Sequence, residues 1–179
     1  MQTTQAVRRT LGVLLLIGSL STVACSSATT KTTPAASIPP VVHTDPAGKF
    51  TAEFPSAPLR EEEKTTVSGL DLLIVSFTTE NGTESVVVGY TDYPKNLQMG
   101  KVLDAAAQGS ADNIKGTLQS KTSTTFMGHP TMDVVVKTPE AMVHERLILR
   151  GNRLYTLVGV GATGKPASYD RLVQTFVLI

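Results

Sequence analysis

The first 25 residues divide this chain into a leader and a part that can fold. Arg8 and Arg9 precede an uncharged apolar run, residues 11–23, that ends at Ala24 and Cys25. As a helix, the run together with Ala24 would span about 21 Å, which is less than the roughly 30 Å of a hydrocarbon core. A basic segment, a short apolar run and a small residue before the processing point are typical of a secretory signal. We therefore expect an export signal that is cleaved between Ala24 and Cys25, not a permanent membrane span.

The end of this leader, Ser21-Thr22-Val23-Ala24-Cys25, resembles the lipobox of bacterial lipoproteins. The resemblance implies that signal peptidase II cuts before Cys25, which carries a diacylglycerol thioether. Thr22 departs from the family, where Leu is usual. Cys25 is the only cysteine, so an intramolecular disulfide is impossible and lipid attachment would account for the thiol. The alternatives are a plain secretory signal, which leaves Cys25 unmodified or removes it, and the twin-arginine route, which Gly12 disfavours.

The charge of the chain excludes some classes of partner. Loss of Arg8 and Arg9 with the leader leaves 14 basic and 15 acidic residues of the original 16 and 15. Nucleic-acid binding requires a basic stripe or patch, and so does a polybasic grip on anionic lipid headgroups. We therefore expect no nucleic-acid partner, and membrane contact only through lipid on Cys25.

A change of composition after Cys25 predicts a tether. Residues 26–46 are mostly Ser, Thr, Ala and Pro, with Ile38, Val41 and Val42 as the larger apolar side chains. Such a segment buries too little apolar surface to order itself. We therefore divide the chain into a signal peptide at 1–24, the lipidated cysteine with a flexible linker at 25–47, and one globular domain at 48–179. His43 falls in this linker and is expected to be a solvated spacer residue.

Hydrophobic periodicity in residues 48–179 predicts an α+β domain with a mostly antiparallel sheet of six or seven strands. A long central helix is expected at about 97–115 and a short helix near the C-terminus, around Tyr169, Leu172, Val173 and Phe176. Asn81-Gly82 predicts a tight hairpin turn. Glu61-Glu62-Glu63-Lys64 indicates a solvated edge or loop. The strands are expected at 50–54, 72–78, 84–93, 118–126, 132–137, 142–149 and 153–160.

Several local motifs resemble the PsbP/Mog1-like domain of bacterial lipoproteins and secreted proteins. They are Phe50–Phe54 with Pro55 and Pro58, Tyr90-Thr91-Asp92-Tyr93-Pro94, Leu103-Asp104-Ala105-Ala106, Gly128-His129-Pro130, the segment Arg146–Tyr155, and Phe176. The resemblance implies an antiparallel sheet sandwiched by helices. Among better-known members, PsbP supports the ionic environment of photosystem II and Mog1 binds a small GTPase. The resemblance therefore implies a partner-binding scaffold and transfers no catalytic residue.

Candidate reactive groups are few. The segment 159–164 spells the dinucleotide pattern GxGxxG, but only 15 residues follow it, too few for the second strand of a βαβ unit, so a loop is the better interpretation. No serine lies in a GxSxG elbow, and the cysteine lies outside the domain. A metal site could combine His129 or His144 with Asp92, Asp104 or Asp133, although nothing in the sequence brings them together.

The sequence thus predicts a non-enzymatic envelope lipoprotein that binds a protein partner or assists an assembly, without a cofactor or a bound metal. The alternative is a carrier of a small ligand or metal ion that uses a cleft beside the sheet. A deep cleft lined by His129, His144 and carboxylates would favour the carrier, and a shallow apolar or aromatic patch would favour a protein partner. The expected location is the extracytoplasmic side of a bacterial membrane, with the inner and the outer membrane both open.

Overall fold

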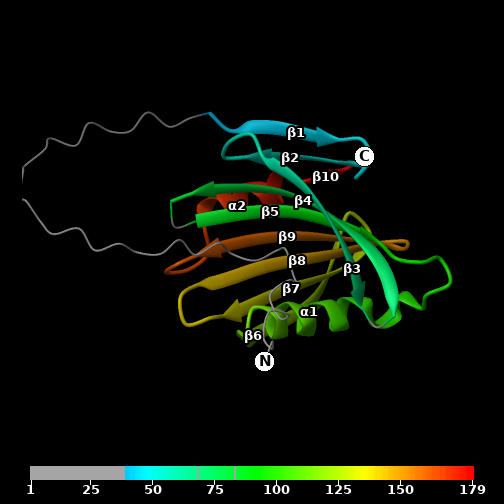
Figure 1. Ribbon diagram of the computed structural model, residues 1–179. Helices are drawn as coiled ribbons and strands as arrows, with labels where there is room; N and C mark the ends of the chain where they lie inside the picture. Colours follow the sequence, from blue (N-terminus) through cyan, green and yellow to red (C-terminus); the bar gives the residue numbers. More distant parts are fainter. Residues whose placement is uncertain (1–38, 68, 83) are drawn as a thin grey trace, which may run out of the picture.

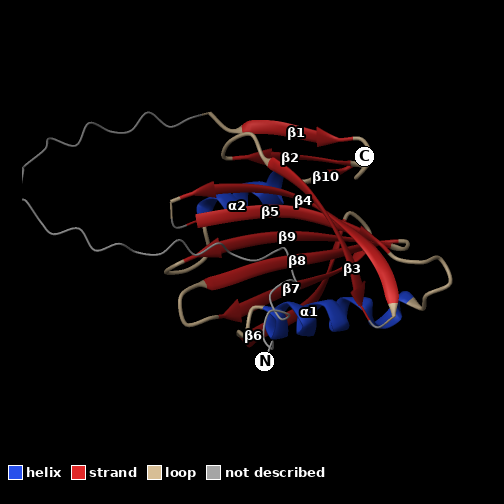
Figure 2. Cartoon of the chain, in the orientation of Figure 1, coloured by secondary structure: helices blue, strands red, loops and turns tan. Residues whose placement is uncertain are grey.

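The computed structural model describes residues 39–67, 69–82 and 84–179 (Figure 1). Within them Figure 2 shows a strand-rich fold with two α-helices. The elements are β1 (Val41–Asp45), β2 (Phe50–Phe54), β3 (Leu59–Val67), β4 (Leu70–Asn81), β5 (Glu84–Asp92), the 3-10 helix η1 (Met99–Lys101), α1 (Val102–Asn113), β6 (Thr117–Phe126), β7 (His129–Lys137), β8 (Met142–Arg150), β9 (Arg153–Gly161), α2 (Ala167–Thr175) and β10 (Val177–Leu178).

A seven-stranded sheet, in which every neighbouring pair is antiparallel, forms the centre of the domain. Its strand order is β3-β4-β5-β9-β8-β7-β6. Strands that follow one another in the sequence are joined by hairpins, except that the connection from β5 to β6 runs through α1. As a result, β5 pairs with β9. This arrangement confirms the prediction of a mostly antiparallel sheet with two helices; the helix predicted at 97–115 is shorter, because 99–101 form the 3-10 helix η1 and α1 spans Val102–Asn113. A second, separate sheet has three strands in the order β1-β2-β10.

The helices cover opposite faces of the large sheet (Figure 1). α1 packs on β6, β7 and β8, whereas α2 packs on β2, β9 and β5. Side chains of β9 point alternately to the two faces of the sheet. Tyr155 and Leu157 enter the core under α2, whereas Leu154 and Val160 enter the core under α1. Among the described residues, no helix is long and apolar enough to span a bilayer.

The small sheet corrects the predicted boundary of the domain. β1 pairs antiparallel with β2 over its whole length, so the folded part begins near Val41 and not at residue 48. His43 is not a solvated spacer residue, because its ring lies 4.6 Å from that of Phe77 and 6.0 Å from that of Phe54. The earlier part of the predicted linker, residues 25–38, lies outside the described residues, as does the predicted leader.

The turns lie close to their predicted positions but use different residues. In the β4–β5 hairpin Asn81 pairs with Glu84, so Gly82, with φ +62°, is a turn residue and Asn81 is still part of the strand. The sequence Gly128-His129-Pro130 predicts a turn, but the β6–β7 turn is Met127-Gly128, with φ values of +49° and +79°, and His129 and Pro130 belong to β7. The edge position expected for the Glu61-Glu62-Glu63-Lys64 segment is confirmed as part of β3.

Candidate functional site

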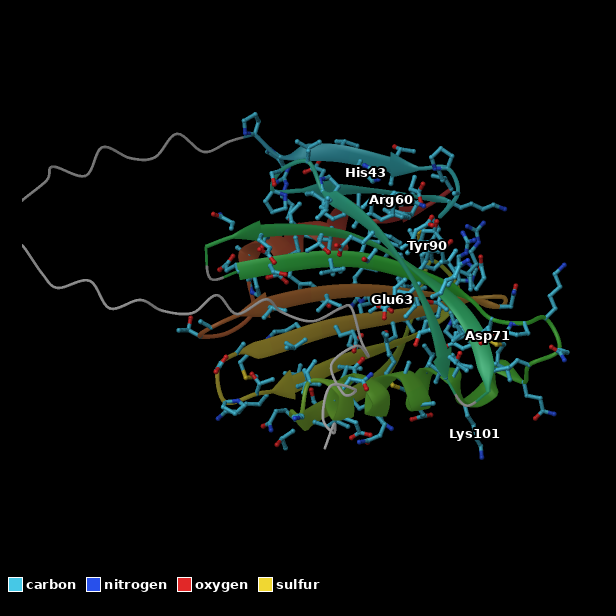
Figure 3. The ribbon with its side chains drawn as sticks, in the orientation of Figure 1. His43, Arg60, Glu63, Asp71, Tyr90 and Lys101 are labelled. Carbon is cyan, nitrogen blue, oxygen red and sulfur yellow. The ribbon has the colours of Figure 1, made fainter. Side chains whose placement is uncertain are left out.

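A group of charged and aromatic side chains from four strands meets where β1 turns into β2. We call it the Tyr90 cluster; Figure 3 labels Arg60 and Tyr90 within it. Its members are Asp45 from β1, Arg60 from β3, Tyr90 and Asp92 from β5, and Arg153 and Tyr155 from β9. The register of the large sheet explains part of this assembly, because Asp92 lies opposite Arg153 and Tyr90 lies opposite Tyr155 on the paired strands β5 and β9.

Arg153 is the centre of this cluster. Its guanidinium donates to both carboxylate oxygens of Asp92 at 2.6 Å and to the backbone oxygen of Ala47 at 2.7 Å. The same group lies 4.6 Å from the ring centre of Tyr90 and 5.9 Å from that of Tyr155. The hydrogen bonds to Asp92 raise the pKa of Arg153. The guanidinium is held in one orientation, because hydrogen bonds fix its edge and the Tyr90 ring lies against its face.

The turn that joins β1 to β2 is fixed by the same cluster. The Asp45 carboxylate accepts a hydrogen bond from the backbone N–H of Gly48 at 2.9 Å, and the hydroxyl of Tyr155 donates to the oxygen of Gly48 at 2.7 Å. A Cβ atom on Gly48 would lie 2.6 Å from both Asp45 Oδ2 and Tyr90 Cε1, so the turn packs too closely for a side chain there. Burial, followed by the charge of Asp45, raises the pKa of Tyr90, so its hydroxyl keeps its proton.

The surface of the Tyr90 cluster is rigid and amphipathic. Tyr90 and Tyr155 are buried, whereas half of the Asp92 side chain and nearly half of the Arg60 side chain are exposed. Arg60 also lies over the ring of Phe77 at 5.9 Å. Tyr and Arg held in fixed orientations are the residue types that dominate binding energy at protein interfaces. The arrangement therefore suits recognition of another surface better than proton transfer.

Replacing Arg153 with Lys is expected to lower the free energy of unfolding by about 1–2 kcal/mol, because an ammonium cannot bond both Asp92 oxygens and Ala47 at once. Urea unfolding followed by circular dichroism would measure the loss. Arg171→Lys is the matched control, since Arg171 is 59% exposed and makes a single hydrogen bond to Glu53, and we expect a loss below about 0.5 kcal/mol there. Equal losses at both positions would contradict the central role of Arg153.

A second unusual group, Glu145 on β8, lies under α1. The residue is only 5% exposed, one carboxylate oxygen accepts a hydrogen bond from Ser110 at 3.1 Å, and the other, Oε2, has no hydrogen-bond partner among the described residues. Its strand neighbours on the same face, Val143 and Leu147, are apolar. This burial raises the pKa of Glu145 to about 7. Glu145 is not among the candidate residues that the sequence suggests.

The structure separates the residues considered for a metal site. Each candidate aspartate has its own cation: Asp92 pairs with Arg153, Asp104 with Lys121 and Asp133 with Arg146. His144 contacts the ring of Tyr169, and burial lowers its pKa. No set of three metal-ligating side chains comes together within residues 39–67, 69–82 and 84–179. Cys25 and Ala24, the predicted lipidation and cleavage residues, lie outside the described part of the chain.

Two shallow hollows open on the surface. One, of about 450 Å³, is lined by the β3–β4 hairpin at Lys64–Thr66 and Asp71–Leu73. The other, of about 360 Å³, lies between the start of α2 and the end of β2; its lining residues are Pro40, Glu53, Phe54, Pro55, Ala167, Ser168 and Arg171. Neither is lined by His129 or His144, which the carrier hypothesis would use.

The glycines of the GxGxxG segment serve packing. A Cβ atom on Gly159 would lie 2.4 Å from Cβ of Tyr169 in α2, and one on Gly161 would lie 2.4 Å from the oxygen of Gly164. Gly159 therefore allows α2 to approach β9 closely, and Gly161 allows the loop at Gly164 to fold back on the end of β9. This supports the interpretation of 159–164 as the end of a strand followed by a loop.

Comparisons with known proteins show the fold. No family model and no curated protein sequence matches the chain. The solution structure of cyanobacterial PsbP (CyanoP) from Synechocystis sp. PCC 6803 superposes with a TM-score of 0.57 at 12% sequence identity, covering 78% of this chain and 92% of that one. At this identity the likeness concerns the fold alone, and it confirms that the fold is PsbP-like.

Proposed function

We propose that this chain is a bacterial envelope lipoprotein, anchored by lipid on Cys25, whose PsbP-like domain acts as a non-enzymatic module that binds a protein partner or assists an assembly. The observation that carries the proposal is the combination of a PsbP-like fold with a leader that ends at the chain's only cysteine. The fold provides a rigid scaffold, and the leader provides an address and an attachment point. The membrane is either the inner or the outer one.

The arrangement of the two ends of the domain supports a tethered module. One end, which we call the Pro40 end, comprises residues 40–42, the β2–β3 connection at 54–59 and the start of α2. The other, the Arg153 end, comprises the β1–β2 turn, the β8–β9 turn and the Tyr90 cluster. A tether that reaches the domain at Pro40 leaves the Arg153 end free to meet a partner.

The residue types at the Arg153 end support protein recognition. Asp92 and Arg153 form an ordered polar surface that rests on the buried ring of Tyr90, and its geometry is set by hydrogen bonds at 2.6 to 2.7 Å. Because the side chains are already ordered, little conformational entropy is lost when a partner docks. The candidate acids of the domain are engaged in ion pairs or buried, which favours a structural role over proton transfer.

Replacing Cys25 with Ser is expected to abolish incorporation of labelled fatty acid and to leave the leader uncleaved, because signal peptidase II cuts before the lipidated cysteine; a shift to the larger precursor on a gel would show the second effect. Ser26→Ala is the matched control and should keep both the lipid and the cleavage. A plain secretory signal would instead give an unlabelled, soluble protein even with Cys25 present. That outcome would overturn the lipid anchor.

A photocrosslinking residue at position 49, which is exposed in the β1–β2 turn, is expected to capture one recurring envelope protein in intact cells. The same residue at position 165, exposed near the Pro40 end, is the control and should give no such adduct. Adduct formation at 49 should fall when Asp92→Ala is added, because the Asp92 carboxylate is part of the proposed surface. Equal adducts from both positions, or none from 49, would argue against recognition through the Arg153 end.

A further inference from the structure

We propose that the Pro40 end of the domain lies against the lipid surface, with Val42 and Leu59 inserted among the headgroups, so that the tethered domain has a fixed orientation. This inference rests on the lipid anchor at Cys25 proposed above. It concerns a contact made by the folded domain itself, in addition to the acyl chains.

Exposed apolar side chains gather at this end. Val42 is 62% exposed, Leu59 is 65% exposed and Val41 is 37% exposed. β1 and β3 both reach the ring of Phe77, through His43 at 4.6 Å and through Arg60 at 5.9 Å. Val41, Val42 and Leu59 precede those contact residues at the Pro40 end of each strand. Because side chains alternate along a strand, Val42 and Leu59 point away from Phe77, and Figure 3 shows the labelled His43 and Arg60 near each other.

Prolines and a hollow extend this apolar surface. Pro40, Phe54, Pro55 and Ala167 line the 360 Å³ hollow together with Ser168 and the Glu53–Arg171 ion pair, and Pro58 precedes Leu59. Pro has no backbone N–H, and so these positions leave fewer unpaired donors to bury at an interface. β1 and β3 are edge strands, so a surface of Val, Leu and Pro fits the headgroup region, where water and headgroups can still bond to the free backbone edges, better than the hydrocarbon core.

The charged residues beside this surface are already paired. Arg171 pairs with Glu53 at 2.6 Å, and Lys165 pairs with Asp170 at 2.6 Å. The surface therefore lacks the excess of cations that would draw it to anionic headgroups. We expect the contact to depend on apolar burial and to persist at high salt and in neutral lipid.

The position of the proposed anchor makes a lipid surface the best candidate to cover the Pro40 end. Residues 26–38 separate Cys25 from the first described residue, Pro39. Whatever their path, they allow a separation of at most about 50 Å. The Pro40 end is attached directly to that segment, so it experiences the highest local concentration of lipid of any part of the domain.

The chain contains no tryptophan, which permits single fluorescent reporters. Leu59→Trp places one at the Pro40 end of β3, and Val67→Trp, at a position 50% exposed, places a matched control at the other end of the same strand, up to about 26 Å away along a nine-residue strand. Val42→Trp is a second reporter. Each substitution is at an exposed position, so the fold is expected to tolerate it.

The lipidated full chain carrying each reporter would be reconstituted into phosphatidylcholine vesicles, with and without phosphatidylglycerol, containing a lipid with a nitroxide near the headgroup. We expect the nitroxide to quench the indole fluorescence of the Leu59→Trp and Val42→Trp chains about threefold more than that of the Val67→Trp chain, because an interfacial apolar contact lies only 5–10 Å deep. Quenching should change little with phosphatidylglycerol content or with salt.

Flotation of the vesicles separates the two proposals. A chain that does not float with the vesicles would refute the lipid anchor itself. A chain that floats but shows equal quenching at positions 59 and 67 keeps the anchor and overturns the oriented contact. Weak quenching at 59 together with concentration-dependent dimerisation would assign the apolar surface to a second copy of the chain and would also overturn it.

Discussion

The Glu145→Gln variant is expected to lose the fall in stability that the unaltered protein shows between pH 5 and pH 8. In the folded protein the carboxyl is buried under α1 with one oxygen unpaired, and its pKa is raised to about 7 from an ordinary value of 4.5. Between these two values the folded state holds a proton that the unfolded state has released. Stability therefore decreases as the pH rises through this window, by about 2 to 3 kcal/mol from pH 5 to pH 8.

Denaturant titrations at several pH values would measure this effect. The slope of stability against pH is the informative quantity, because a buried Gln amide has unsatisfied donors of its own that change the absolute stability at every pH. Comparison with the unaltered protein cancels the contribution of His144, whose pKa is lowered by burial. Glu61→Gln, at an exposed position on β3, is the control. An unchanged slope in Glu145→Gln would show that Glu145 is ionised in the folded protein.

The Gly159→Ala variant is expected to lose about 2 to 3 kcal/mol of folding free energy, since overpacking in a close contact forces backbone shifts. The added Cβ would meet Cβ and Cγ of Tyr169 at 2.4 and 2.5 Å, and these atoms are at the base of the side chain, where they cannot move without moving α2. Thermal unfolding monitored by circular dichroism would measure the loss.

Gly164→Ala is the matched control within the same GxGxxG segment. A Cβ atom at Gly164 meets nothing within 4 Å, and its φ lies outside the left-handed region. We expect a neutral or slightly stabilising effect there, because Ala restricts the unfolded chain. If the segment were a nucleotide-binding loop, both Gly159→Ala and Gly164→Ala would instead weaken nucleotide binding. Equal stability losses at 159 and 164 would contradict the packing explanation.

The seven predicted strands and both helices are present. Most of them show an apolar period of two or about 3.6, or a continuous apolar run, whereas β6 is Thr-rich and largely exposed. Three further strands were missed. β1 was assigned to the linker because its inward side chains, His43 and Asp45, are polar while Val42 points outward. β3 carries three consecutive glutamates, and β10 has only two residues, so neither shows an alternation that a local pattern could identify.

The Tyr90 cluster could not be predicted, because its members are brought together by strand pairing across the chain. The hydrogen bonds of Arg153 reach residues 61 and 106 positions away. Glu145 was more accessible to prediction. It alternates with Val143 and Leu147 on β8, and a carboxylate between two inward apolar residues indicates a buried acid.

The pairing of β10 with β2 has a consequence for the timing of folding. Leu178 lies opposite Phe50 and Val177 opposite Thr51, and the ring of Phe176 stacks on Phe50 at 5.5 Å. A ribosome-bound chain that has emerged only to β9 therefore still lacks the last strand of the small sheet and leaves Phe50 without that ring. Completion of the small sheet thus waits until synthesis has passed residue 178, and on the proposed export route this delay would favour the unfolded form that a secretion channel accepts.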